Sequence, residues 1–172
     1  MLVWHSLVNQ VPMETVRVRT IAGSETELSR DALSGLQNRL RGDLVLRDAP
    51  GYEDARKLWN GMIDKHPALF VRCAGPPDVI ASVNFARDHQ LLCSVRGGGH
   101  NVAGNALVED GMVIDLSTMR SVRVDPERRL VRAEGGATLA DLDHESQVHS
   151  LATPVGLVSR TGVAGLTLGG GF

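Results

Sequence analysis

LLCSVRGGGHNVAG, residues 91–104, is the stretch from which the rest of the sequence is interpreted. Its first six residues predict a buried strand, and this strand runs directly into the triple glycine 97–99 and His100. Successive glycines allow several backbone N–H groups to turn toward one point without interference from a Cβ atom. Such a concavity binds phosphate, and Arg96 could add a positive charge to it. The loop is therefore a candidate phosphate site.

A second glycine-rich segment, TGVAGLTLGGGF at 161–172, again combines small residues with hydroxyl groups. Two glycine-rich segments that could each bind a phosphate suggest a dinucleotide. A Rossmann assignment fits poorly, because no clear helix follows the first glycine loop and no acidic residue ends a parallel strand at the expected distance. Asp115, in the strand-like segment GMVIDLS, is the nearest candidate for binding a ribose. A turn-capping role for Asp115 is favoured over ribose binding.

Hydrophobic spacing and turn signals predict a mixed succession of elements. Helices are expected at 24–40, opened by a capping box of Ser24 and Glu27, and then at 50–63, 78–90 and from Thr138 onward. Strands are expected at 42–47, 68–73, 91–96, 111–117, 121–126 and 129–136, with the turn of a hairpin at 125–128. This order predicts an α+β or mixed α/β body.

Composition excludes several classes of protein. The chain has 172 residues, of which 42% are hydrophobic, and a net charge of −2, so it should have a core and gives no basic footprint for nucleic acid. No stretch is apolar for long enough to cross a membrane, and the N-terminus is a poor signal peptide. Cys73 and Cys93 are expected to be buried thiols in a reducing compartment, which predicts a cytoplasmic protein with no membrane partner.

The remaining histidines and the tryptophans are expected to be structural. Five histidines share no spacing typical of a metal site and are expected at the surface: His5, His66, His89, His144 and His149. Trp4 and Trp59 are interpreted as packing residues, with Trp59 on the apolar face of the predicted helix 50–63. No metal site is predicted.

Three motifs in order resemble FAD-linked oxidases of the berberine bridge enzyme and 6-hydroxy-D-nicotine oxidase type. They are VRGGGHNVAG (95–104), DGMVIDLSTMRSVRVDPERRLVRAEGGATLADLD (110–143) and ATPVGLVSRTGVAGLTLGGGF (152–172). The resemblance covers about residues 42–172, after an N-terminal extension and helix at 1–41. It implies an α+β fold, the PCMH-type FAD-binding domain, with two small α/β subdomains and FAD between them. The domain is expected to be incomplete, without the substrate domain.

The resemblance also assigns the cofactor site. In the family, the histidine of the glycine loop bonds covalently to the 8α-methyl carbon of the flavin, which makes His100 the candidate attachment site; a hydrogen bond to phosphate or backbone is the alternative. Some members add a second bond through a cysteine, but Val158 stands at that position here. The residues implied in binding FAD are Arg96, Gly97, Gly98, Gly99, His100, Asn101, Gly104, Gly156, Thr161, Gly162, Gly165, Thr167, Gly169 and Gly170.

The implied function is that of a flavin-dependent oxidoreductase. Flavin takes a hydride from a C–H bond next to nitrogen or oxygen in a small organic substrate and passes electrons to O₂ or another acceptor. Relatives carry the substrate-binding sheet and the catalytic base further downstream, so no catalytic residue is predicted in this chain and it is expected to be inactive alone. Two alternatives stay open: a non-catalytic, nucleotide-binding remnant, and a flavoprotein of the same fold that holds FAD without a covalent bond.

Overall fold

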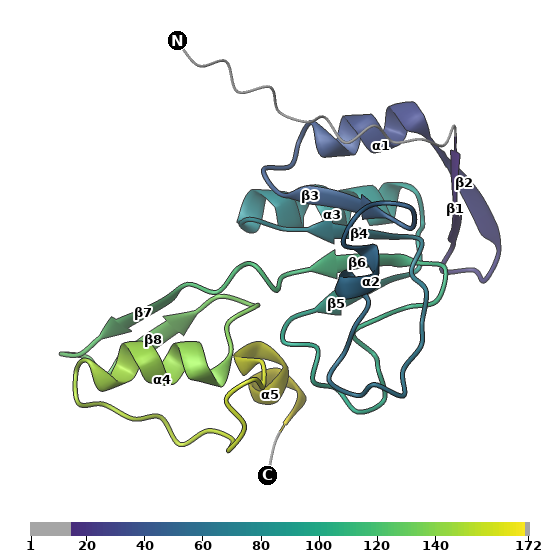
Figure 1. Cartoon of the computed structure of the whole chain (residues 1–172). Coiled ribbons are helices and arrows are strands. Elements are labelled where there is room, and N and C mark those ends of the chain that lie inside the picture. Colours follow the sequence, from purple (N-terminus) through teal and green to yellow (C-terminus); the bar gives the residue numbers. More distant parts are fainter. Residues whose placement is uncertain (1–14, 171–172) are drawn as a thin grey trace.

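The computed structural model describes residues 15–170, which form two lobes (Figure 1). The first lobe is built on a four-stranded sheet with the order β3-β4-β6-β5. Its strands are β3 (Asp43–Leu46), β4 (Leu69–Arg72), β5 (Cys93–Arg96) and β6 (Met112–Asp115). Strand β3 runs antiparallel to β4, whereas β4 and β5 both run parallel to β6. The predicted mixed α/β body is thereby confirmed.

The sheet packs against one hydrophobic core on each of its faces. Leu69 and Val71 of β4 point into a core with α1 (Arg30–Gln37), α3 (Pro76–Asp88) and the hairpin of β1 (Thr15–Arg19) and β2 (Glu25–Ser29). Phe70, between them, points into a second core with Tyr52 and Ala55 of the one-turn helix α2 (Tyr52–Ala55). Successive strand residues face opposite sides of a sheet, so this strand supplies both cores.

The second lobe is a hairpin packed on a helix. Strands β7 (Val122–Asp125) and β8 (Leu130–Ala133) pair antiparallel, and α4 (Leu139–Gln147) lies against them (Figure 1). The predicted turn 125–128 is confirmed, and the Asp125 side chain accepts a hydrogen bond of 3.0 Å from the Arg128 backbone N–H. Thr138 begins α4, as predicted. The short helix α5 (Val163–Gly169) follows and has no buried residue.

The predicted helix at 24–40 is wrong in its first half. Residues 25–29 are strand β2, which pairs with β1, a strand that the sequence did not predict. The cap of α1 is Ser29, whose hydroxyl accepts a hydrogen bond of 3.2 Å from the Ala32 backbone N–H. Leu28 is buried in the core through β2, so an apolar position that fits a helix is used by a strand. Tertiary pairing overrides local helical spacing here.

The predicted helix at 50–63 is also wrong beyond its first turn. Only residues 52–55 are helical, and the side chain of Met62 is 90% exposed. The Arg96 guanidinium donates hydrogen bonds to the backbone carbonyls of Ala55 and Lys57. These hydrogen bonds hold residues 55–57 in the irregular path that they follow after α2.

The two cysteines differ in exposure. Cys73 is buried as predicted, and burial raises the pKa of its thiol. Cys93 is exposed, which contradicts the prediction: it lies on the edge strand β5, and its side chain belongs to neither core cluster. Within residues 15–170 no helix is long and apolar enough to cross a membrane.

Candidate functional site

The two glycine-rich segments meet backbone to backbone at Gly98 and Gly162. A Cβ atom on Gly98 would lie 2.5 Å from the backbone nitrogen of Gly162 and 2.6 Å from its Cα. A Cβ atom on Gly162 would lie 2.6 Å from the backbone nitrogen of Gly98. Any side chain at either position would collide with main-chain atoms that have little freedom to move. Glycine at these positions therefore brings the second lobe into direct contact with the loop of the first.

The backbone N–H groups of the triple glycine are free. No described residue accepts a hydrogen bond from the N–H of Gly97, Gly98 or Gly99. Gly99 has φ +64°, the left-handed conformation that turns successive N–H groups to one side. Backbone N–H groups that have no acceptor among residues 15–170 are available as donors to an anion.

The Arg96 side chain contacts the segment that follows α2. Its guanidinium donates to the backbone carbonyls of Ala55 and, at 3.2 Å, Lys57. Its Nε atom is buried and has no hydrogen-bond partner among the described residues. Arg96 therefore connects β5 to the segment after α2.

The imidazole of His100 stacks on the indole of Trp59. The ring centroids are 4.6 Å apart, and the planes lie 21° from parallel. The Nε2 atom of His100 is buried, and no described residue forms a hydrogen bond with it. A buried polar atom without a partner costs about 1 to 3 kcal/mol. A bond from Nε2 to a ligand would remove that cost, so this histidine fits a site of cofactor contact.

Two other predicted residues of the first segment form turns. The Asn101 side-chain oxygen accepts a hydrogen bond of 3.1 Å from the Asn105 backbone N–H. Gly104 has φ +70°, and a Cβ atom there would lie 2.7 Å from Cγ2 of Ile63. Both residues hold the shape of the connection that follows His100.

The predicted residues of the second segment divide into two groups. Thr161 lies at the junction with α4, because its carbonyl accepts a hydrogen bond of 2.9 Å from the Leu139 backbone N–H. Gly156 lies near the side chains of Leu139 and Leu166. The others lie on or directly after α5 and are exposed: Gly165, Thr167, Gly169 and Gly170. A Cβ atom on any of the last group's glycines would meet no described atom within 4 Å.

Trp59 is the contact residue that sequence reasoning missed. It lies outside any helix, and its side chain is 59% exposed, so its predicted place on the apolar face of a helix is wrong. Neither hydrophobic spacing nor a motif indicates that Trp59 lies beside His100. Asp115 has the predicted turn-capping role, since its carboxylate accepts a hydrogen bond of 3.0 Å from the Ser117 backbone N–H.

The other histidines of the described part of the chain form no metal site. Among residues 15–170, no group of three or more His, Cys, Asp or Glu side chains could hold a metal ion. His89, His144 and His149 are exposed, as predicted, and His66 is half-buried. His5 and Trp4 lie outside the described residues.

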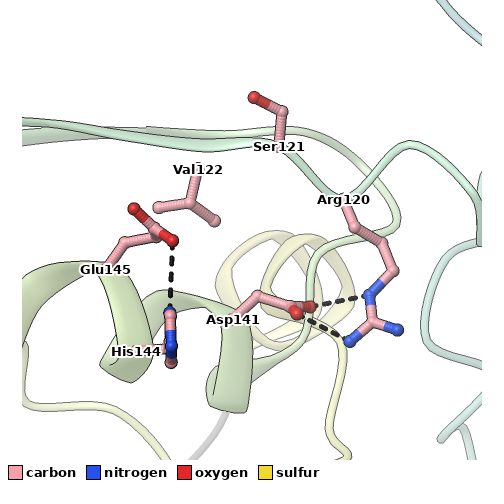
Figure 2. Close-up of a pocket in the computed structure, with 6 residues that line it drawn as sticks. All are labelled: Arg120, Ser121, Val122, Asp141, His144 and Glu145. Carbon is pink, nitrogen blue, oxygen red and sulfur yellow. Dashed lines mark hydrogen bonds and ion pairs between the residues drawn. The ribbon is translucent and has the colours of Figure 1, made fainter.

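A separate pocket of about 290 Å³ lies between β7 and α4 (Figure 2). Its walls are Arg120, Ser121, Val122, Asp141, His144 and Glu145. The Arg120 guanidinium donates to both carboxylate oxygens of Asp141, at 2.6 and 2.9 Å. The pocket contains none of the predicted cofactor residues, and the ion pair holds the start of α4 against the connection between the lobes.

Asp141→Asn is expected to lower the free energy of unfolding by about 1 to 2 kcal/mol at pH 7, after allowance for solvent screening. Burial alone would raise the pKa of Asp141, but hydrogen bonds from Arg120 and Thr138 outweigh it and lower the pKa from 3.8 to about 2. A lowered folded-state pKa contributes stability that is present above about pH 4 and is lost as the pH falls toward 2.

Urea unfolding between pH 2 and pH 7 checks this expectation. The difference between wild type and Asp141→Asn should shrink as the pH falls through that window. Asp143→Asn, at an exposed position on the same helix, is the control and should change little. A constant difference at every pH would contradict the role given to the Asp141 carboxylate.

The chain belongs to the FAD binding domain family, whose model matches residues 67–172. The mixed α/β fold and the glycine-rich site agree with this assignment. The chain is thus part of an FAD binding domain, as the resemblance implied.

Similar curated proteins support this assignment. The chain is 41% identical over 140 residues to the FAD-linked oxidoreductase hasG of Aspergillus fumigatus, covering 81% of this chain and 30% of that protein. It is 36% identical over 132 residues to (R)-6-hydroxynicotine oxidase of Paenarthrobacter nicotinovorans, covering 77% of this chain and 29% of that protein. The chain therefore spans about 30% of the length of these relatives.

Solved structures give the same fold. 6-Hydroxy-D-nicotine oxidase from Arthrobacter nicotinovorans superposes with a TM-score of 0.71 at 35% identity, over 74% of this chain and 28% of that one. Phl p 4, a grass pollen allergen with glucose dehydrogenase activity, gives a TM-score of 0.75 at 28% identity, over 83% and 32% of the two chains. The predicted PCMH-type fold, present in part, is confirmed.

Proposed function

We propose that this chain binds FAD where its two lobes meet and attaches the flavin covalently through His100. The observation that carries the proposal is the buried Nε2 atom of His100, at the end of the glycine loop, which has no hydrogen-bond partner among residues 15–170. The loop itself would receive the pyrophosphate, since the N–H groups of 97–99 have no acceptor among the described residues. FAD when bound supplies the hydride acceptor of an oxidoreductase.

Attachment of the flavin to His100 is a two-electron oxidation. One C–H bond of the 8α-methyl group and one N–H bond of the imidazole are replaced by one C–N bond. Two protons and two electrons are released, and O₂ takes them up as H₂O₂. A neutral imidazole has a lone pair for forming this bond. His100 contributes that lone pair, and the loop holds the ring at the required place.

The protein residues around His100 bind and orient rather than react. The contact of Gly98 with Gly162 joins the two lobes at the loop that leads to His100. The Arg96 guanidinium places a positive charge behind the loop, where it favours a bound diphosphate. No general base is assigned among these residues.

The whole oxidoreductase would oxidise a small organic substrate at a C–H bond next to nitrogen or oxygen, with O₂ or another electron acceptor. Relatives support this range, because one is named a 6-hydroxynicotine oxidase and another has glucose dehydrogenase activity. They resemble 77% and 83% of this chain, so differences in substrate would arise from other parts of those proteins.

Flavin retained after acid precipitation tests the proposal. Wild-type chain expressed in flavin-replete cells is expected to keep its yellow absorbance in the precipitate, and His100→Gln to lose it. His149→Gln, at an exposed histidine, is the matched control and should keep the flavin. If flavin were released from the wild type, covalent attachment would be excluded and only noncovalent binding would remain.

A further inference from the structure

We propose that Trp59 is the positioning residue for His100, which it holds by stacking so that the imidazole points one ring nitrogen at its ligand. This inference rests on the proposed role of His100 in flavin attachment. It adds the residue that fixes the orientation of the ring. Trp59 belongs to neither glycine-rich segment.

Four hydrogen bonds run between the segment 55–60 and the loop 96–102. Two are donated by the Arg96 guanidinium to the backbone carbonyls of Ala55 and Lys57. The Trp59 backbone N–H donates to the Gly99 carbonyl at 3.2 Å. The Asn60 side-chain amide donates to the Val102 carbonyl at 2.7 Å. The backbone of Trp59 is therefore bound to the residue directly before His100.

The indole ring is then placed over the imidazole. The centroid distance of 4.6 Å and the angle of 21° describe a stacked pair. Because Trp59 remains 59% exposed, the stack on His100 explains the orientation of its ring better than burial in a core does. A large aromatic side chain left at the surface with one face on a functional ring is better explained by that contact than by packing.

Stacking restricts the rotation of His100. A free histidine side chain distributes over about three χ1 wells, and the glycines before His100 provide no side chain to restrict it. Aromatic pairs contribute about 0.5 to 1.5 kcal/mol beyond their buried area. A value in the middle of this range favours one orientation about fivefold. Loss of the stack should therefore lower the rate of flavin attachment by about fivefold.

The direct test is the ring-current shift of His100 in the chain without flavin. In ¹³C-histidine-labelled protein, the imidazole C–H protons of His100 are expected to lie upfield of the other histidines, and His100→Gln identifies the signal. Trp59→Leu should abolish the upfield shift, and Trp59→Phe should keep part of it. Met62→Leu, an exposed side chain of the same loop, is the matched control and should keep it fully.

The rate of flavin attachment is the second readout. Trp59→Leu is expected to attach flavin about fivefold more slowly than wild type, and Trp59→Phe to recover most of the rate. Urea midpoints of the variants show whether they are folded. An unchanged His100 shift or an unchanged attachment rate in folded Trp59→Leu would overturn the inference. Wild type that attaches no flavin would instead overturn the proposed function, while the shift still decides whether Trp59 holds the ring.

Discussion

Gly98→Ala is expected to lower the free energy of unfolding by about 3 kcal/mol, at the upper end of the range for overpacking, and to abolish flavin retention. The added Cβ atom would lie 2.5 Å from the backbone nitrogen of Gly162 and 2.6 Å from its Cα. Main-chain atoms cannot rotate away as the end of a flexible side chain can. The two lobes would have to separate at the point where we place the cofactor.

Urea unfolding and the flavin content of the purified protein measure this effect. Gly35→Ala, in helix α1, is the matched control, because a Cβ atom there meets no described atom within 4 Å. Alanine in a helix is about 0.5 to 1 kcal/mol more favourable than glycine, so this variant should be equally or more stable. If Gly98→Ala retained flavin and wild-type stability, the backbone contact between the lobes would be disproved.

Asp78→Asn is expected to lower the free energy of unfolding by about 3 kcal/mol. Asp78 is fully buried, and its carboxylate accepts hydrogen bonds from the backbone N–H groups of Arg41 at 3.1 Å, Gly42 at 3.0 Å and Ala74 at 2.8 Å. An asparagine side chain has only one acceptor oxygen. Its NH₂ group would face at least one backbone donor, which would then be buried without a partner.

The pH dependence gives Asp78→Asn a second signature. Burial alone would raise the pKa of Asp78, but the three backbone N–H groups outweigh it and lower the pKa below 3.8. The stability that Asp78 contributes is thus present above about pH 4 and is lost as the pH falls below that value. Unfolding midpoints of wild type and variant should converge in acid. Asp88→Asn, exposed at the end of the same helix, should change little at any pH.

The sheet could be predicted because its strands carry their own signal. The apolar runs at 68–73 and 111–117 became β4 and β6, whose side chains are buried on both faces. The failures occurred where distant residues decide local structure. Leu28 fits a helix by spacing but pairs with β1, and the segment after α2 is bound by the distant Arg96 through its backbone carbonyls.

The site could be predicted in its residue types but not in its contacts. The glycine loop and His100 follow from sequence and resemblance. The contact of Gly98 with Gly162 and the stack of Trp59 on His100 depend on how the lobes and loops pack. Asp78 was predicted only as part of a helix, since nothing in its neighbourhood indicates that its carboxylate would bind the distant backbone at residues 41 and 42.

Peptide mapping of the flavin attachment point tests the central claim most directly. Trypsin should release residues 97–120 as one peptide, because Arg96 precedes it, Arg120 ends it and no lysine or arginine lies between. His100 is its one histidine, and it contains no cysteine or tyrosine. We predict that this peptide from chain made in flavin-replete cells carries the flavin mass on His100, and that the mass is absent from His100→Ala. An unmodified peptide, or flavin on any other peptide, would contradict the account.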